Sequence, residues 1–107
     1  MNPILHIDFE TRSAVDLRKA GLHRYAADPT TDVLCMAYAF DGEVKLWTPP
    51  FDLRNKYDLE FVSKGGTVCA HNVHFELAIW NNVMVPRYGW PVLKPEQCIC
   101  TMAMAYA

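Results

Sequence analysis

The chain has 107 residues, of which 51% are hydrophobic and 12% aromatic, and its formal net charge is −2. This composition predicts one domain with a packed core and excludes a disordered chain. No apolar run approaches the roughly 18–20 residues of a membrane-spanning helix, and the N-terminus lacks a signal-peptide pattern, so we expect a cytoplasmic protein without membrane contact. The slightly acidic balance lacks the overall basic field that would hold nucleic acid unaided.

The first predicted strand, residues 3–10, is apolar apart from His6, Asp8 and Glu10. Because side chains alternate between the two faces of a strand, Asp8 and Glu10 project from the same face. The apolar residues between them occupy the other face and anchor the strand in a core. Two neighbouring carboxylates repel each other unless a cation or proton lies between them, so the pair is a candidate divalent-metal platform. The commoner explanation of a lone Asp-x-Glu is a solvated strand end.

The sequence that follows the first strand predicts an irregular segment, here called the excursion (residues 11–31), and then a hairpin. Residues 11–31 are polar and mixed, which indicates irregular structure. Residues 33–40 and 43–47 predict two strands, and Asp41-Gly42 between them is a two-residue hairpin signal.

The second half of the chain predicts a helix–strand–helix–strand order. Gly65-Gly66 should end the first of these helices, and Pro86 should follow the end of the second, for which Asn72 is a plausible N-cap. The predicted elements are a helix over 53–64, a strand over 67–70, a helix over about 74–85, a strand over 97–100 and the opening of a helix over 101–107. This pattern predicts the α/β class, with a mixed sheet covered by helices.

Glu76 is the unusual residue of the second predicted helix. At 100° per residue it falls inside the apolar arc of that helix. Burying an unpaired carboxylate costs roughly several kcal/mol, so we expect Glu76 to have a partner. One alternative is a salt bridge to Arg24 or Arg87, or a side chain that extends to the edge of the helix so that its carboxylate meets solvent. The other is that Glu76 faces the sheet edge where Asp8 and Glu10 end.

Three converging carboxylates, Asp8, Glu10 and Glu76, would form an oxygen site suited to Mg²⁺ or Mn²⁺. Such ions lower the pKa of a bound water and stabilise the leaving oxygen of an in-line displacement. The reaction class implied is phosphodiester hydrolysis.

The four cysteines lie mostly in apolar stretches, and we expect them to be reduced thiols. Cys98 and Cys100 could join His71 and His74 as a zinc set. The one-residue spacing of the cysteines fits structural zinc poorly, which makes this the weaker alternative.

The segments that contain these candidate site residues also resemble sequence motifs of a known protein family. Ile7-Asp8-Phe9-Glu10-Thr11 resembles the first exonuclease motif, Asp-x-Glu-Thr, of the DEDD proofreading-exonuclease superfamily, which has a ribonuclease H-like fold. Ala70-His71-Asn72-Val73-His74-Phe75-Glu76 resembles the second motif, Asn-x-x-Phe-Asp. The wider sequence is similar, over essentially all 107 residues, to the N-terminal part of bacteriophage and prophage family A DNA polymerases, notably at 16–21, 24–26, 85–90 and 100–103.

This resemblance implies a ribonuclease H-like mixed sheet and a 3′→5′ exonuclease that acts on the 3′ end of single-stranded DNA. It implies that the metal ligands, for two Mg²⁺ or Mn²⁺ ions, are Asp8, Glu10 and Glu76. It further implies that the 3′-terminal nucleotide contacts Phe9 and Thr11, and that the residues shaping the pocket are Asn72 and Phe75.

The sequence departs from the family pattern in two ways. Glu76 stands where the superfamily usually has Asp, so its carboxylate reaches one methylene further. The third motif, with its Asp and general base, would lie beyond residue 107, as would a polymerase domain. We therefore expect residues 1–107 to be a single partial exonuclease domain with little hydrolytic activity of its own.

Two alternatives to a DNA exonuclease remain at this point. The chain could be a non-catalytic module whose fold is completed by self-association or by a partner, such as the remainder of a polymerase. It could also be an RNA-directed member of the same superfamily.

Overall fold

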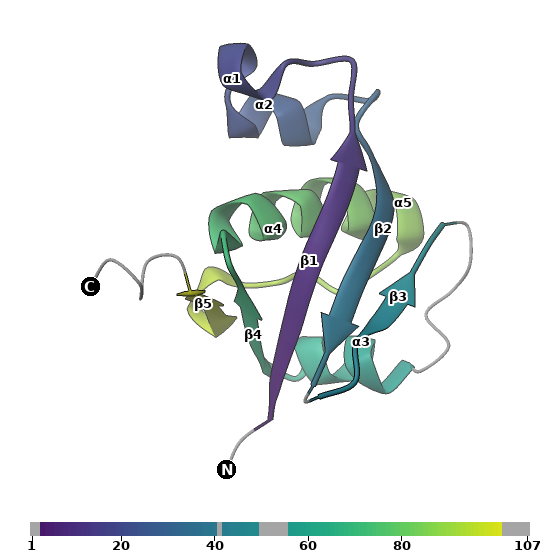
Figure 1. Ribbon diagram of the computed structural model, residues 1–107, viewed down its shortest axis with the longest axis vertical. Helices are drawn as coiled ribbons and strands as arrows, with labels where there is room; N and C mark the ends of the chain where they lie inside the picture. Colours follow the sequence, from purple (N-terminus) through teal and green to yellow (C-terminus); the bar gives the residue numbers. More distant parts are fainter. Residues whose placement is uncertain (1–2, 41, 50–55, 102–107) are drawn as a thin grey trace.

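The computed structural model describes residues 3–40, 42–49 and 56–101 of the chain. Its centre is a five-stranded mixed sheet in the order β3-β2-β1-β4-β5, and α3, α4 and α5 lie behind it in Figure 1. The strands are β1 (Ile4–Arg12), β2 (Asp32–Ala39), β3 (Lys45–Trp47), β4 (Thr67–Ala70) and β5 (Cys98–Cys100). The helices are α1 (Leu17–Ala20), α2 (Leu22–Ala27), α3 (Lys56–Ser63), α4 (Val73–Ile79), the π-helical η1 (Trp80–Met84), α5 (Val85–Tyr88) and the 3₁₀ turn η2 (Pro95–Gln97). The predicted α/β class and the helix–strand–helix–strand order are confirmed.

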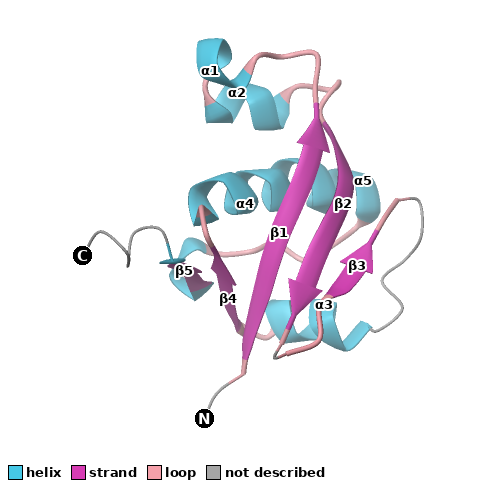
Figure 2. Cartoon of the chain, viewed as in Figure 1, coloured by secondary structure: helices cyan, strands magenta, loops and turns pink. Residues whose placement is uncertain are grey.

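β1 is the central strand, and its two neighbours differ in direction and length. It pairs antiparallel with β2 from His6 to Arg12, but parallel with β4 only from Ile4 to His6. Figure 2 shows β1 and β2 running well past the short β4. The second half of β1 therefore has an edge that none of the described strands covers, and α4 begins beside it.

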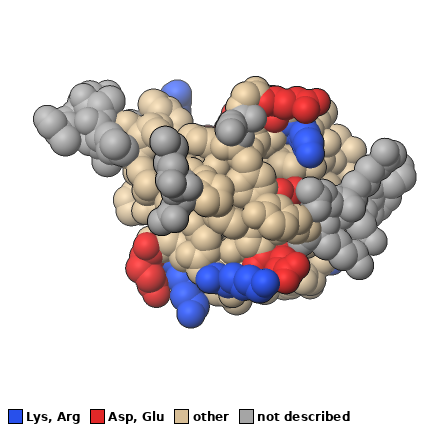
Figure 3. Space-filling model, turned by 90° about the horizontal axis from the view of Figure 1, so that it is seen from below, with Lys and Arg blue, Asp and Glu red and all other residues tan. Residues whose placement is uncertain are grey.

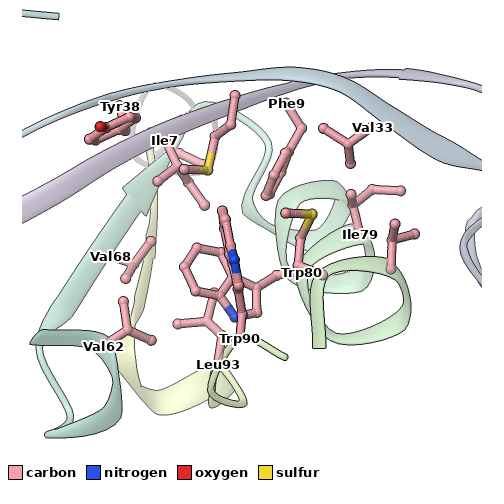
Figure 4. Packing of buried hydrophobic residues seen from close by; sticks show 14 of the residues in the cluster. Ile7, Phe9, Val33, Tyr38, Val62, Val68, Ile79, Trp80, Trp90 and Leu93 are labelled. Carbon is pink, nitrogen blue, oxygen red and sulfur yellow. The ribbon is translucent and has the colours of Figure 1, made fainter. Parts of the chain in front are cut away.

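The core lies between the inner face of the sheet and the helices. In β1, Leu5, Ile7 and Phe9 are at most 4% exposed, whereas the alternating His6, Asp8 and Glu10 are exposed. Figure 4 shows the β1 side chains above a group of aromatic and aliphatic residues from the rest of the chain. This group includes Val33, Val62, Val68, Ile79, Trp80, Trp90 and Leu93. The alternation predicted for the first strand is confirmed.

Three indole rings form a continuous row through this core. The ring centroids of Trp80 and Trp90 are 4.8 Å apart, and those of Trp90 and Trp47 are 5.2 Å apart. Each of the three side chains is at most 5% exposed. Such edge-to-face pairs add to the free energy gained from burial alone.

The predicted irregular excursion over residues 11–31 is wrong in part. β1 continues to Arg12, and the excursion contains two short helices, α1 and α2. Gly21 separates them with φ of +86°, a backbone conformation that favours glycine. The sequence pattern missed these helices because each is too short to show a period.

The prediction that the second helix ends before Pro86 is also wrong. The helix passes through Pro86 and ends at Gly89, which is left-handed with φ of +71°. A proline ring in a regular α-helix clashes with the carbonyl four residues before it. Here the Val85 N–H donates to the carbonyl of Trp80, five residues back, so the backbone is widened into a π-turn just before the proline.

The hairpin agrees with its prediction in part, because its second strand begins at Lys45 and not at residue 43, and the third helix agrees with its prediction where it is described. Tyr38 is opposite Lys45, and the same register continued would place Phe40 opposite Glu43, on either side of a two-residue turn. Asp41 of that turn lies outside the described residues, as do residues 53–55 of the helix predicted over 53–64 and residues 102–107 of the helix predicted over 101–107.

Candidate active site

Asp8 and Glu10 extend from the exposed face of β1, as their spacing predicts. Their neighbours Ile7 and Phe9 are buried on the opposite face, each 4% exposed, and hold this part of the strand in place. The two carboxylates are therefore presented to solvent from a strand whose other side belongs to the core.

Glu76 approaches the same strand from α4. It is only 5% exposed, and its Oε2 accepts a hydrogen bond of 2.9 Å from the backbone N–H of Phe9, which lies between the two acidic residues of β1. This contact is possible because β4 pairs with β1 only as far as His6 and leaves the edge at Phe9 open. The prediction that Glu76 faces the edge of the first strand is confirmed.

The alternative of an arginine partner for Glu76 is wrong within the described part of the chain. Arg87 instead contacts Asp32, with Nη1 and Oδ1 3.4 Å apart, and donates to the carbonyl of Pro29 at 2.6 Å. Arg24 is exposed on α2 and forms no salt bridge among the described residues. Glu76 therefore lies buried with no described cation to balance its charge.

The surroundings of Glu76 make its charged form costly. Burial raises its pKa to about 7; the Phe9 N–H bond opposes this shift, and the charges of Asp8 and Glu10 add to it. A carboxyl group with this pKa is a mixture of its neutral and charged forms near neutral pH. Asp8 and Glu10 thus act electrostatically on Glu76 although it comes from a distant part of the sequence.

Carboxylates are suitable ligands for Mg²⁺ or Mn²⁺, and buried negative charge without a balancing cation fits such an ion. The side chains are not gathered tightly, however. Across residues 3–40, 42–49 and 56–101, no three His, Cys, Asp or Glu side chains form a group that could hold a metal ion. The strand and the helix bring the three carboxylates to the same part of the sheet. To bind one ion, their side chains would have to turn toward a shared centre.

Thr11, which the resemblance assigns to nucleotide contact, is hydrogen-bonded to a tyrosine of the segment that follows β1. Its Oγ1 lies 2.7 Å from the hydroxyl of Tyr25 on α2. Tyr25 is 8% exposed, and its ring centroid is 6.2 Å from that of Phe75 on α4. Tyr25 therefore links the excursion to the two predicted site segments, and only a long-range contact could have revealed this.

The other residues expected at the pocket have structural contacts. The Phe9 ring is buried, with its centroid 6.3 Å from that of Trp80, so its contact with a nucleotide stays a prediction. Asn72 occupies the predicted N-cap position, but its side chain makes no capping hydrogen bond. Its carbonyl accepts from the N–H groups of Phe75 and Glu76, at 3.1 and 3.3 Å, and so fixes the first turn of α4.

The zinc alternative gains no support. All four cysteines are reduced thiols. Burial raises the pKa of Cys98 to about 11, which disfavours the thiolate that zinc requires. The Cys100 thiol donates to the carbonyl of His71 at 3.3 Å, and Nδ1 of His71 lies 3.3 Å from the Thr101 hydroxyl.

No helix in the described part of the chain combines the length and apolarity needed to cross a bilayer.

No protein-family model matches the chain, and no solved structure matches it either. Its sequence is 51% identical over 104 residues to a DNA polymerase of Bacillus phage SP02, an alignment that covers 94% of this chain. The chain spans 15% of the length of that polymerase. Nearly all of the chain is therefore similar to one segment of a bacteriophage DNA polymerase.

Proposed function

We propose that the chain supplies metal-binding carboxylates of a proofreading-type 3′→5′ exonuclease with a ribonuclease H-like fold, acting on the 3′ end of single-stranded DNA. The observation that carries this proposal is the hydrogen bond from the Phe9 N–H to Glu76, because it draws an acid of α4 to the strand that presents Asp8 and Glu10. The strand order supports it, since an antiparallel β3-β2-β1 unit is extended by the parallel β4 and β5. The similarity to a phage DNA polymerase supports a DNA substrate.

In this proposal Asp8, Glu10 and Glu76 hold one or two Mg²⁺ or Mn²⁺ ions. When bound, such ions would generate hydroxide near neutral pH and stabilise the leaving oxygen of the phosphodiester. The contribution of the chain is to position the carboxylates. Phe9 positions them in two ways. Its ring is packed in the core and holds the strand of Asp8 and Glu10, and its N–H orients Glu76.

Thr11 would contact the terminal nucleotide through its hydroxyl. A hydroxyl has one hydrogen to donate and two lone pairs, so it can bond both Tyr25 and a second polar group. The 2.7 Å contact with Tyr25 holds the Thr11 side chain in one orientation, next in sequence to Glu10. This arrangement would fix the nucleotide relative to the carboxylates.

Asp8→Asn is expected to abolish the binding of Mn²⁺, because it removes a negative oxygen ligand at nearly constant size. Isothermal titration of the two proteins with Mn²⁺ measures this. The matched control is Glu96→Gln, which changes the net charge equally but lies on the exposed η2 turn. We expect weak binding by the wild type and by the control; equal heats from wild type and Asp8→Asn would refute the metal site.

The proposed site residues include no general base, and a general base contributes about 10²–10⁴-fold to the rate, so hydrolysis by residues 1–107 alone should be slight. A labelled DNA strand and an RNA strand of the same sequence, incubated with Mn²⁺, would compare the two substrate classes. We expect whatever cleavage occurs to favour DNA and to be absent from Asp8→Asn. Preferential cleavage of RNA would favour the RNA-directed alternative.

A second candidate function is docking of a partner on the open face of the sheet. The strand register places Asp8, Ala37 and Leu46 in one row across this face. Three large apolar side chains at or beside it, Leu34, Val44 and Leu46, are 51–68% exposed. A groove of about 180 Å³ lies beside them, lined by His6, Ile7, Asp8, Ala37, Tyr38, Ala39 and Val44.

We propose that the partner is the remainder of a phage-type DNA polymerase, because the similar polymerase is several times longer than this chain. Co-purification of the chain with the rest of the Bacillus phage SP02 polymerase tests this. Leu46→Glu should abolish co-purification, whereas Val92→Glu, at a residue that is similarly exposed but outside the sheet, should not. Light scattering over a concentration series would detect self-association, the competing explanation of the exposed face.

A further inference from the structure

Positive charge is concentrated in the excursion that precedes β2. Residues 12–27, here called the basic arm, comprise the last residue of β1 and the whole of α1 and α2. The basic arm contains four of the ten Lys and Arg residues of the chain against a single acid, Asp16. It therefore has a formal charge of +3 in a chain whose net charge is −2. The four basic residues are Arg12, Arg18, Lys19 and Arg24, and all four are exposed.

These cations are not used in salt bridges. In the described ranges, the salt bridges are Lys64 with Glu60, at 2.8 Å, and Arg87 with Asp32, at 3.4 Å. Asp28, just after the basic arm, attracts Arg24 only weakly, and its carboxylate accepts from the N–H and hydroxyl of Thr30 at 2.8 and 2.6 Å. The charges of the basic arm are therefore available to an anion from solution.

The described residues visible at the other end of the molecule show no such concentration. In the view of Figure 3, which looks from the end opposite α1 and α2, Lys and Arg lie beside Asp and Glu around a largely uncharged surface. The excess of positive charge in residues 12–27 is thus a local feature and not the average of the surface.

The basic arm is fixed to the candidate active site. The hydroxyl of Tyr25, on α2, lies 2.7 Å from that of Thr11, and its ring packs against Phe75 of α4. Thr31 adds a second anchor, because its hydroxyl contacts the carbonyl of Tyr25 and the hydroxyl of Ser13, both at 2.6 Å. Figure 1 shows α1 and α2 beyond the end of β1 at which the acidic residues lie.

We propose that the basic arm binds the phosphate backbone of single-stranded DNA and leads the strand to the carboxylates of β1 and α4. The function of the site as an exonuclease centre is the proposal made above, and the guiding role rests on it. Acidic residues at the site repel the phosphates of a substrate unless metal is bound. A neighbouring group of exposed cations offsets this repulsion, because each phosphate that a Lys or Arg neutralises releases a counterion.

The test is DNA binding without divalent metal, which separates the basic arm from the carboxylates. Fluorescence anisotropy of a labelled oligothymidine of about 15 nucleotides is measured in EDTA at several salt concentrations. Arg18→Gln with Lys19→Gln is compared with Lys64→Gln with Lys94→Gln, which removes the same charge elsewhere on the exposed surface. Circular dichroism and thermal melting of each variant confirm that it is folded.

We expect the Arg18/Lys19 variant to bind about 3- to 10-fold more weakly at low salt, while the Lys64/Lys94 variant changes less than twofold. The slope of log affinity against log salt should fall by about 1.4 for two lost phosphate contacts on a single strand. Equal affinities of the two variants for the oligonucleotide would overturn the proposal. Asp8→Asn should bind the oligonucleotide in EDTA at least as well as wild type, so failure of the metal site and failure of the basic arm give different results.

Discussion

Glu76→Gln is expected to stabilise the metal-free chain at pH 8.5 by about 2–3 kcal/mol. The folded state raises the pKa of Glu76 to about 7, against 4.5 for an exposed glutamate. The stability associated with this group is therefore fully present below pH 4.5 and is lost as the pH rises through 7. A shift of this size corresponds to about 3 kcal/mol at high pH, and glutamine does not titrate.

Urea denaturation at pH 5.5 and pH 8.5 measures this effect. Wild type should lose stability between the two values, whereas Glu76→Gln should change much less, because its amide oxygen can still accept the Phe9 N–H. Glu96→Gln, at an exposed position, is the matched control and should follow wild type. If the stability of wild type and that of Glu76→Gln changed equally with pH, the folded state would not raise the pKa of Glu76.

The same variant separates stability from function. Mn²⁺ should raise the melting temperature of wild type at pH 8.5, since a cation bound to the folded state offsets the repulsion among Asp8, Glu10 and Glu76. Glu76→Gln should be more stable without metal and respond less to it. A residue that lowers the stability of the metal-free protein is not there to support folding. Such residues are typical of functional sites.

Trp80→Ala is expected to destabilise the chain by about 3–5 kcal/mol, the range for truncation of a buried aromatic residue. Trp80 is 1% exposed, its ring packs against those of Phe9 and Trp90, and its indole N–H donates to the carbonyl of Pro91 at 2.6 Å. Because a domain of this size is stable by only about 5–15 kcal/mol, the loss should be large enough to unfold part of the population.

Urea denaturation followed by circular dichroism measures the effect. Trp80→Phe should lose less of the free energy of unfolding, since a ring remains against Phe9. Leu46→Ala, at a residue that is 65% exposed, should change this free energy by less than about 0.5 kcal/mol. Because Phe9 positions Glu76 through its N–H, Trp80→Phe should also weaken Mn²⁺ binding. Equal loss of stability from Trp80→Ala and Leu46→Ala would show that the row of indole rings does not support the sheet.

Much of the local structure could be predicted from the sequence. The alternation of β1 and the position of Glu76 on the apolar side of its helix follow from periods of 2 and 3.6 residues. These periods depend on backbone geometry that is the same in every protein. The end of α3 at Ser63, just before Gly65-Gly66, follows from the preference of glycine for the position after a helix. The errors were at α1 and α2, which are too short to show a period, and at Pro86, where the π-turn relieves a clash that usually ends a helix.

The sequence by itself determined which residues are candidates for the chemistry, because Asp8, Glu10 and Glu76 are carboxylates on a strand and a helix of recognisable pattern. Only the tertiary structure decided that Glu76 reaches the strand that presents Asp8 and Glu10. The early end of β4 opens the edge of β1 at Phe9 to Glu76, and the packing of α2 brings Tyr25 to Thr11. Strand length and helix packing depend on contacts between residues far apart in the chain, and no periodicity within a local segment records them.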